Sequence, residues 1–128
     1  MINIQTCWDF SEDEKPMIPV IPITILSIED NKSELFFKVD SGYAGALGIT
    51  SEVSKKLNLI KMGMIKIMSP MGEKLVPYYQ TYVENNEWGL KTSLAYAIET
   101  PRLLAGRSLF KGKKLMLDFE ENQVCILN

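Results

Sequence analysis

The stretch that decides the fold is FFKVDSGYAGAL, residues 36–47. A largely apolar run ends at Asp40, and the loop that follows carries Gly42, Gly45 and Gly48. Glycine at this density is typical of tight backbone with unusual dihedral angles rather than of a regular element. The stretch therefore predicts a strand that delivers a single carboxylate into a constrained turn.

The triplet Asp40-Ser41-Gly42 has two interpretations. Taken alone, it is typical of an ordinary turn at a strand end, where the aspartate caps its own turn. As part of a site, the turn would hold the carboxylate at a fixed point close to the Gly42 amide. The Ser41 hydroxyl would then hydrogen-bond neighbouring backbone and stiffen the loop. The rest of the chain has to decide between the two.

The chain has 128 residues, which suits one compact domain, residues 1–128, with residues 1–16 as an N-terminal extension. Hydrophobic residues make up 46% of it, enough for a sizeable core. The net charge is −2 and both signs are scattered, so we expect neither nucleic acid nor a membrane as partner. The first residues lack a basic end followed by an apolar run, and the apolar stretch 17–26 is too short to cross a bilayer. We therefore expect a cytoplasmic protein.

The sequence contains no histidine, and this excludes several kinds of site. Within one chain it removes Ser-His and Cys-His nucleophile pairs and every zinc site that uses histidine. Two distant cysteines, Cys7 and Cys125, cannot supply a cysteine-only zinc site, so we expect no metal and no cofactor. In the cytoplasm we expect these two residues to be buried free thiols rather than a disulfide.

Extended patterns dominate, so the sequence predicts an all-β fold with one or two short helices. The expected strands are residues 3–8, 20–27, 35–39, 64–68, 75–83, 90–98, 114–119 and 124–127, with a short buried run at 103–105. Prolines place the strand at 20–27 near a sheet edge. A helix should begin at a cap formed by Thr50 or Ser51 and end near Asn58. Residues 107–111 could form one or two helical turns closed by Gly112.

Four features, in this order, resemble the retropepsin-like aspartic proteases. They are the apolar strand with Asp40-Ser41-Gly42, a turn-tipped hairpin at 64–79 where the family has its flap, the segment Leu104-Ala105-Gly106-Arg107, and the strand at 114–119. Together they cover residues 21–119. The aromatic residue after the triplet, Tyr43, looks more like the cellular bacterial and archaeal branch of this clan.

The resemblance implies a closed β-barrel of the acid-protease type and assigns roles by position. Asp40 would be the catalytic residue, with Ser41 and Gly42 in its loop. The residues expected to bind substrate, in the loop and in the flap, are Tyr43, Ala44, Ser69, Pro70, Met71 and Gly72. The structural second motif would be Leu104, Ala105, Gly106 and Arg107. Retroviral members usually continue with alanine and two acids after the glycine, whereas this chain has Tyr43-Ala44-Gly45, which leaves Arg107 without the acid it pairs with there.

Smaller expectations concern the hairpin and the N-terminus. Met68 and Met71 could line an adaptable apolar groove, although core filling is the favoured interpretation for Met64 and Met68. The extension at 1–15 could join a dimer interface or cover the groove as an intramolecular plug. No dedicated charged pocket is visible in the sequence, so we lean toward apolar side chains at the cleaved bond.

Peptide hydrolysis by carboxylates needs two acids around one water, and one chain supplies one Asp-Ser-Gly. The expected function is therefore a homodimeric aspartic endopeptidase, in which a two-fold axis brings Asp40 beside its own copy and a polypeptide is the substrate. Two alternatives stay open. One is a non-catalytic retropepsin-like module for peptide binding or dimerisation, and the other is an unrelated β-barrel binding domain with a coincidental triplet.

Overall fold

The computed structural model describes residues 3–27, 29 and 31–128. Residues 1–2 of the expected extension and Asp30 of a polar turn lie outside this part. The described residues form β1 (Ile4–Asp9), β2 (Val20–Leu26), β3 (Lys32–Val39), β4 (Leu47–Ile49), α1 (Ser51–Lys56), β5 (Ile60–Ser69), β6 (Gly72–Asn85), β7 (Leu90–Glu99), β8 (Leu104–Ala105), β9 (Lys114–Asp118) and β10 (Gln123–Leu127). The expected all-β class is confirmed.

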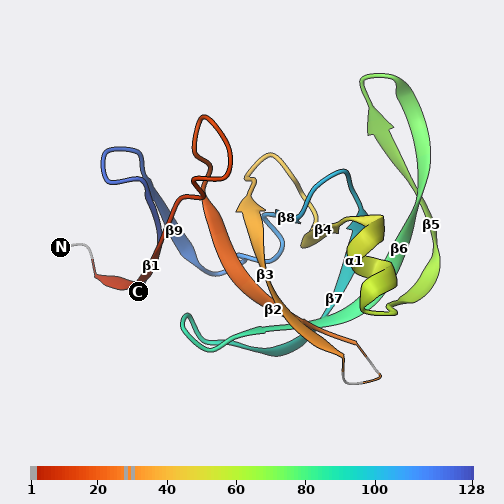
Figure 1. Ribbon diagram of the computed structural model, residues 1–128, viewed down its shortest axis with the longest axis horizontal. Coiled ribbons are helices and arrows are strands. Elements are labelled where there is room, and N and C mark those ends of the chain that lie inside the picture. Colours follow the sequence, from red (N-terminus) through yellow and green to blue (C-terminus); the bar gives the residue numbers. More distant parts are fainter. Residues whose placement is uncertain (1–2, 28, 30) are drawn as a thin grey trace.

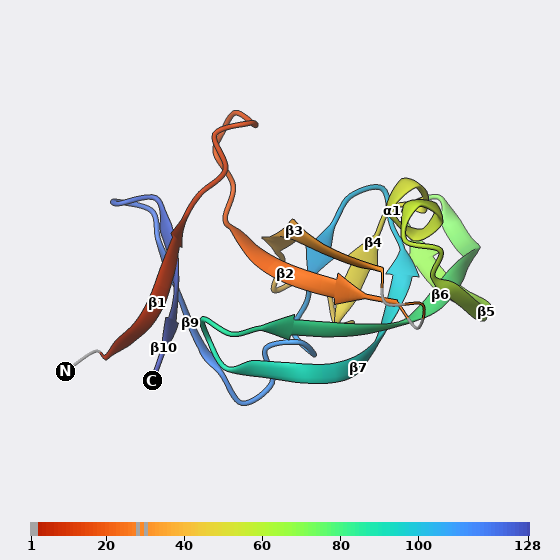
Figure 2. The same ribbon diagram turned by 60° about the horizontal axis from the view of Figure 1, so that its bottom comes forward.

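The strands form two sheets (Figures 1 and 2). A small sheet has the order β1-β10-β9 and holds both ends of the chain, and a larger one has the order β2-β3-β8-β4-β7-β6-β5. Strand β2 also pairs with β6 through residues 24–26, so the pairings run round a ring of six strands. The expectation that β2 lies at an edge is thus wrong for its second half. Pro22, which cannot donate a hydrogen bond, lies in the half that pairs only with β3.

Alternation along the first hairpin builds much of the core. Ile21, Ile23 and Ile25 of β2 are fully buried, and Phe37 of β3 is buried between them and the rest of the ring. On the other face of β3, Phe36 and Lys38 are less buried. The face that carries these two side chains also receives the residue after Val39, which is Asp40.

The expected helix is confirmed. The Thr50 hydroxyl accepts a hydrogen bond from the Val53 backbone N–H at 3.3 Å, which makes Thr50 the N-cap of α1. Leu57 ends the helix and is buried, and Asn58 adopts a positive φ of 50°. Both features follow from the sequence pattern.

The second predicted helix is wrong, because residues 107–112 form consecutive turns. The N–H of Leu109 donates to Gly106 O at 3.1 Å and that of Phe110 donates to Arg107 O at 3.2 Å, each spanning three residues. The N–H groups of Arg107 and Ser108 instead donate to carbonyls of another loop. These two bonds tie the start of the segment to the Asp40 loop.

The prediction of free thiols is also wrong. Cys7 of β1 lies directly opposite Cys125 of β10, and the two form a disulfide with Cα atoms 4.0 Å apart. Strand pairing between the two ends of the chain brings them together across 118 residues of sequence. Because the two cysteines are so far apart in the sequence, no local pattern predicts that they are neighbours.

The hairpin of β5 and β6 projects from the body of the molecule (Figure 1). Its methionines are not core residues: Met64 is 48% exposed, Met68 76% and Met71 96%. Core filling is therefore wrong for Met64 and Met68. A long two-stranded ribbon has too few neighbours to bury both of its faces. Among the described residues, no helix is long and apolar enough to cross a membrane.

Candidate active site

The loop after β3 holds Asp40 by its backbone and by its side chain. The Asp40 N–H donates to Ala105 O at 3.0 Å, which extends the parallel pairing of β3 with β8 by one residue. The Gly42 N–H donates to Asp40 Oδ1 at 3.0 Å, and the Tyr43 N–H donates to Asp40 O at 3.1 Å. One carboxylate oxygen is thus anchored by the turn, and the side chain remains partly open to solvent.

Gly42 and Ser41 contribute differently from each other. A Cβ atom on Gly42 would lie 3.2 Å from Asp40 Oδ1, so the glycine permits the close approach of its amide to the carboxylate. Ser41 is exposed, and its hydroxyl makes no hydrogen bond to any described residue. The expected stiffening of the loop therefore comes from the carboxylate of Asp40 rather than from the serine.

The second motif lies directly beside the Asp40 loop, because its strand β8 is paired between β3 and β4. Ala105 pairs with Val39 on one side and with Leu47 on the other. The segment after β8 then crosses the Asp40 loop: the Gly106 N–H donates to Ala46 O at 2.9 Å, and the Arg107 N–H donates to Tyr43 O at 2.9 Å. These bonds connect the middle and the end of the Asp40 loop to one neighbouring segment.

Close packing at this crossing explains the glycine of the second motif. A Cβ atom on Gly106 would overlap the carbonyl oxygen of Gly45 and would lie 2.6 Å from Tyr43 O and Tyr43 Cδ2. The Ser108 hydroxyl donates to Ala44 O and adds a further link. Arg107 itself is exposed and makes no ion pair with a described residue. Its backbone, rather than its charge, holds the loop.

Tyr43 folds back against its own loop. Its hydroxyl donates to Leu47 O at 2.9 Å, and a Cβ atom on Gly45 would lie 2.7 Å from that hydroxyl. Burial raises the pKa of the Tyr43 phenol above its ordinary value. Tyr43 thus packs within the loop, while Ala44 is exposed beside it.

The expected flap residues lie at the tip of the β5–β6 hairpin. The Ser69 hydroxyl accepts from the Met71 N–H at 3.2 Å and donates to Gly72 O at 2.8 Å, which closes the turn around exposed Pro70. Gly72 has a φ of +110°, a value that favours glycine. Within the part of the chain described, no hydrogen bond joins this tip to the Asp40 loop. The site residues of the sequence analysis thus form two groups.

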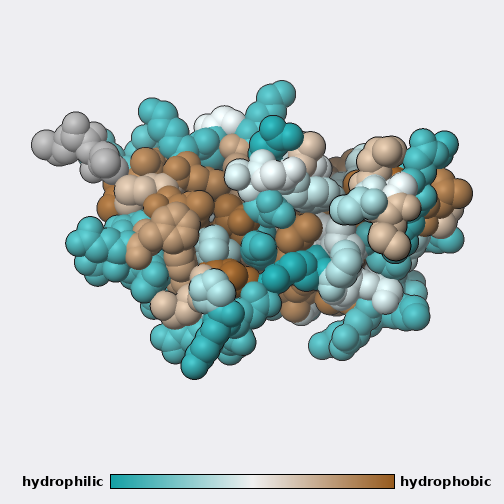
Figure 3. All heavy atoms as spheres, turned by 90° about the horizontal axis from the view of Figure 1, so that it is seen from above, coloured by the Kyte–Doolittle hydropathy of each residue, from teal (hydrophilic) through white to brown (hydrophobic). Residues whose placement is uncertain are grey.

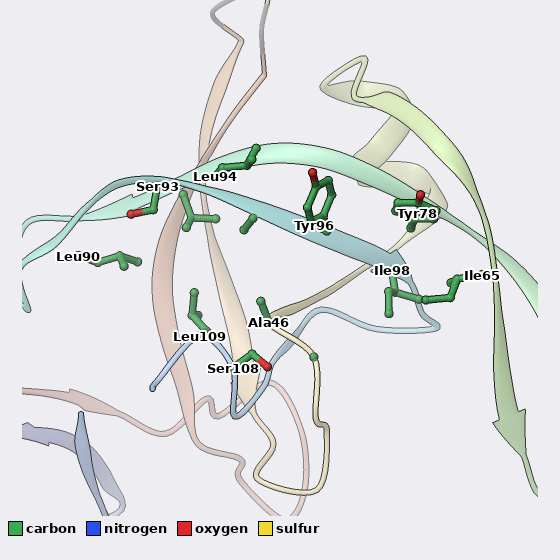
Figure 4. A pocket seen from close by; sticks show the side chains of 13 residues that line it. Ala46, Ile65, Tyr78, Leu90, Ser93, Leu94, Tyr96, Ile98, Ser108 and Leu109 are labelled. Carbon is green, nitrogen blue, oxygen red and sulfur yellow. The ribbon is translucent and has the colours of Figure 1, made fainter. Parts of the chain in front are cut away.

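An apolar pocket of about 710 Å³ lies between the end of the Asp40 loop and the β5–β6 hairpin, and none of the predicted site residues lines it (Figure 4). It is bounded by the loop at Gly45 and Ala46, by Ile65 and Tyr78 of the hairpin, and by β7. Tyr78 and Tyr96 meet there edge to face, with ring centroids 6.1 Å apart. Sequence reasoning missed the β7 residues because their alternation is that of any half-buried strand.

Among the described residues, no three histidine, cysteine, aspartate or glutamate side chains are grouped so as to hold a metal ion. The chemistry that this site offers is that of one anchored and partly exposed carboxylate.

Comparisons with known proteins place the fold. No family model matches the sequence, and no curated protein matches it either. Among solved structures, the EIAV protease complexed with the inhibitor HBY-793 is similar, with 15% identity and a TM-score of 0.58, over 86% of this chain and 100% of that chain. A retropepsin-like aspartic protease from Rickettsia conorii is also similar, with 16% identity and a TM-score of 0.59, over 99% of this chain and 91% of that one. The chain therefore has the fold of the retropepsin-like aspartic proteases, as its motifs predict.

Proposed function

We propose that this chain is an aspartic endopeptidase that works as a homodimer, with Asp40 of each copy contributing one carboxylate to a shared site. The observation that carries the proposal is the anchored carboxylate of Asp40, held by Gly42 and Ala105 in a retropepsin-like fold. One chain holds one such group, whereas hydrolysis needs a base and an acid. A two-fold axis through the site would supply both from identical residues.

The chemistry of the pair follows from charge repulsion. Two carboxylates that share one water do not ionise together easily, so the pair holds one proton. The ionised member takes a proton from the water, whose oxygen attacks the carbonyl carbon of the peptide bond. The protonated member stabilises the carbonyl oxygen, and proton return to the amide nitrogen accompanies cleavage of the C–N bond. Water is consumed, and one amine and one carboxylic acid are produced.

Features of the small sheet support the proposal of a dimer. In the described chain, β1 and β9 each pair on one side only, and the sheet carries exposed Ile4, Leu117 and, just beyond β9, Phe119. Hydrophobic residues gather over this end of the molecule in Figure 3. A second copy would bury those side chains and pair the open edges. The expected partners are thus a second copy and a polypeptide.

The hairpin would cover the substrate. Its exposed apolar side chains, Met64, Met68 and Met71 among them, are adaptable and would pack against an extended peptide. Closure would exclude water from the reacting bond. The location in the cytoplasm stays a prediction, and the free thiols that were expected from it are not found, because Cys7 and Cys125 form a disulfide.

The test compares the wild-type chain with Asp40→Asn on a denatured protein at mildly acid pH. We expect the variant to lose cleavage, to keep its fold and to keep the solution mass of a dimer. Glu52→Gln, an exposed carboxyl-to-amide change in α1, is the control and should cleave normally. Cleavage by Asp40→Asn at the wild-type rate would refute the proposal. A wild-type dimer without cleavage would favour the non-catalytic module.

A further inference from the structure

A basic pair lies beside the Asp40 loop. Lys38 is two residues before Asp40, so strand alternation places both side chains on the same face. The Lys38 N–H donates to Leu103 O at 3.1 Å, which sets Lys38 alongside the segment that contains Arg102. Lys38 and Arg102 line one pocket of about 260 Å³ together with Phe36 of the same strand face. The pocket therefore lies along the face of β3 that leads to Asp40, two residues beyond Lys38.

The opposite wall of this pocket is an acidic loop. Residues 12–17 are all exposed, and the loop is pinned at its base by a bridge between Ser11 and Ile18. Glu14 reaches from it to Arg102, with Oε1 2.7 Å from Nη2. The loop has little burial of its own, so this ion pair is a main contact of its outer part. Such a segment moves at low free-energy cost.

Arg102 is only partly satisfied by Glu14. Its Nε is buried and has no hydrogen-bond partner, whereas Nη2 carries the contact to Glu14. A guanidinium binds a carboxylate best through two parallel hydrogen bonds, and Nε with Nη2 is one such fork, which becomes accessible once the acidic loop that covers it moves. Asp13 of that loop also lines the pocket, but neither Asp13 nor Lys38 forms an ion pair with any described residue. When the loop moves away, Lys38 and Arg102 are left as two cations that can bind a carboxylate.

We propose that Lys38 and Arg102 bind a carboxylate side chain of the polypeptide substrate, and that Glu14 occupies Arg102 until that carboxylate displaces it. This inference rests on the proposed function and names a substrate preference for it. A two-fold dimer would present the subsite twice, once on each side of the paired Asp40 residues. The preference is for aspartate or glutamate near the cleaved bond, in addition to apolar side chains.

The first test measures binding without cleavage. Asp40→Asn is titrated with two degenerate heptapeptide pools, identical except for a central glutamate or a central glutamine. We expect the glutamate pool to bind about fivefold more tightly, because a charge-assisted bond at a half-exposed site has that order of strength. Adding Arg102→Gln should reduce the difference, and adding Lys38→Gln as well should abolish it. Equal binding of the two pools, or a preference that Arg102→Gln leaves undiminished, would overturn the proposal.

A variant in the acidic loop should change the preference for the glutamate pool in the opposite direction to Arg102→Gln. Glu14→Gln removes the competing carboxylate, so the preference for the glutamate pool should increase. Glu12→Gln makes the same charge change on the same exposed loop, has no ion pair in the described chain and should leave the preference unchanged. If Arg102→Gln does not fold, Glu14→Gln decides the matter alone, and an unchanged preference would refute the role of Glu14 and the subsite.

Cleavage mapping separates this inference from the proposed function. Peptides released from a denatured protein by the wild-type chain are sequenced, and enrichment of acidic residues around the cut sites is expected. Cleavage without enrichment, together with equal pool binding, would refute the subsite and leave the endopeptidase intact. No cleavage, with the glutamate pool still preferred, would refute the endopeptidase and leave an acidic-peptide binding site.

Discussion

Replacing Gly106 by alanine tests how the Asp40 loop is held. The new Cβ would overlap the Gly45 carbonyl and approach Tyr43 O to 2.6 Å, whereas real Cβ contacts essentially never fall below 3.0 Å. The loop must therefore shift, which strains or breaks the bonds from Gly106 to Ala46 and from Arg107 to Tyr43. Overpacking costs about 1–3 kcal/mol and each lost hydrogen bond about 1 kcal/mol, so we expect a loss of about 3 kcal/mol in unfolding free energy.

Denaturant titration measures the change in unfolding free energy. The rate at which the variant cleaves a denatured protein shows whether the Asp40 loop keeps its conformation. Without denaturant the Gly106→Ala variant should remain folded. We expect it to lose activity even then, because Asp40 moves with the loop. Gly112→Ala is the matched control. Gly112 has a φ of +81° and no atom within 4 Å of an added Cβ, so it should lose only about 1 kcal/mol from backbone strain and keep its activity. A Gly106→Ala chain as stable and active as the wild type would refute the packing argument.

Two other predictions concern the disulfide and the buried phenol. Replacing Cys7 and Cys125 by serine should lower the free energy of unfolding by about 4–5 kcal/mol, because the disulfide closes most of the chain into a loop. An unchanged urea midpoint without reductant would contradict this, whereas with reductant the wild type and the variant should have the same midpoint. Burial raises the pKa of Tyr43, so above pH 10.0 the unfolded chain ionises first and stability falls as pH rises toward the folded-state pKa. Tyr43→Phe should show a shallower alkaline loss of stability than the wild type, and identical slopes would refute that contribution.

Local rules predicted much of this fold. Alternation at residues 20–39 and the turn at Ser69–Gly72 gave both hairpins, and Thr50 marked the helix start, because these features depend on neighbours in sequence. The tract around Asp40 also identified the carboxylate. What sequence reasoning missed depends on long-range pairing. The disulfide needs β1 beside β10, and the turns after Gly106 need the carbonyls of the Asp40 loop.

The basic pair illustrates the same limit at the site. Lys38 and Arg102 are 64 residues apart in sequence, and no motif links the two. The ladder of β3 with β8 makes them neighbours, and the acidic loop that covers them precedes both. Charge in a pocket is therefore visible only after strand order is known. Exposure of the hairpin methionines likewise depends on how far the hairpin projects from the ring.

The central claim is that two Asp40 carboxylates form one site, and mixed dimers test it most directly. Wild-type and Asp40→Asn chains are refolded together at varied ratios and assayed for cleavage of a denatured protein at constant total chain. If each site needs both carboxylates, activity falls with the square of the wild-type fraction, so an equal mixture retains about a quarter of full activity. A linear fall, with about half the activity at equal mixture, would mean that each Asp40 works independently of the other, and about three quarters would mean that one Asp40 suffices for the shared site; either result would contradict the account.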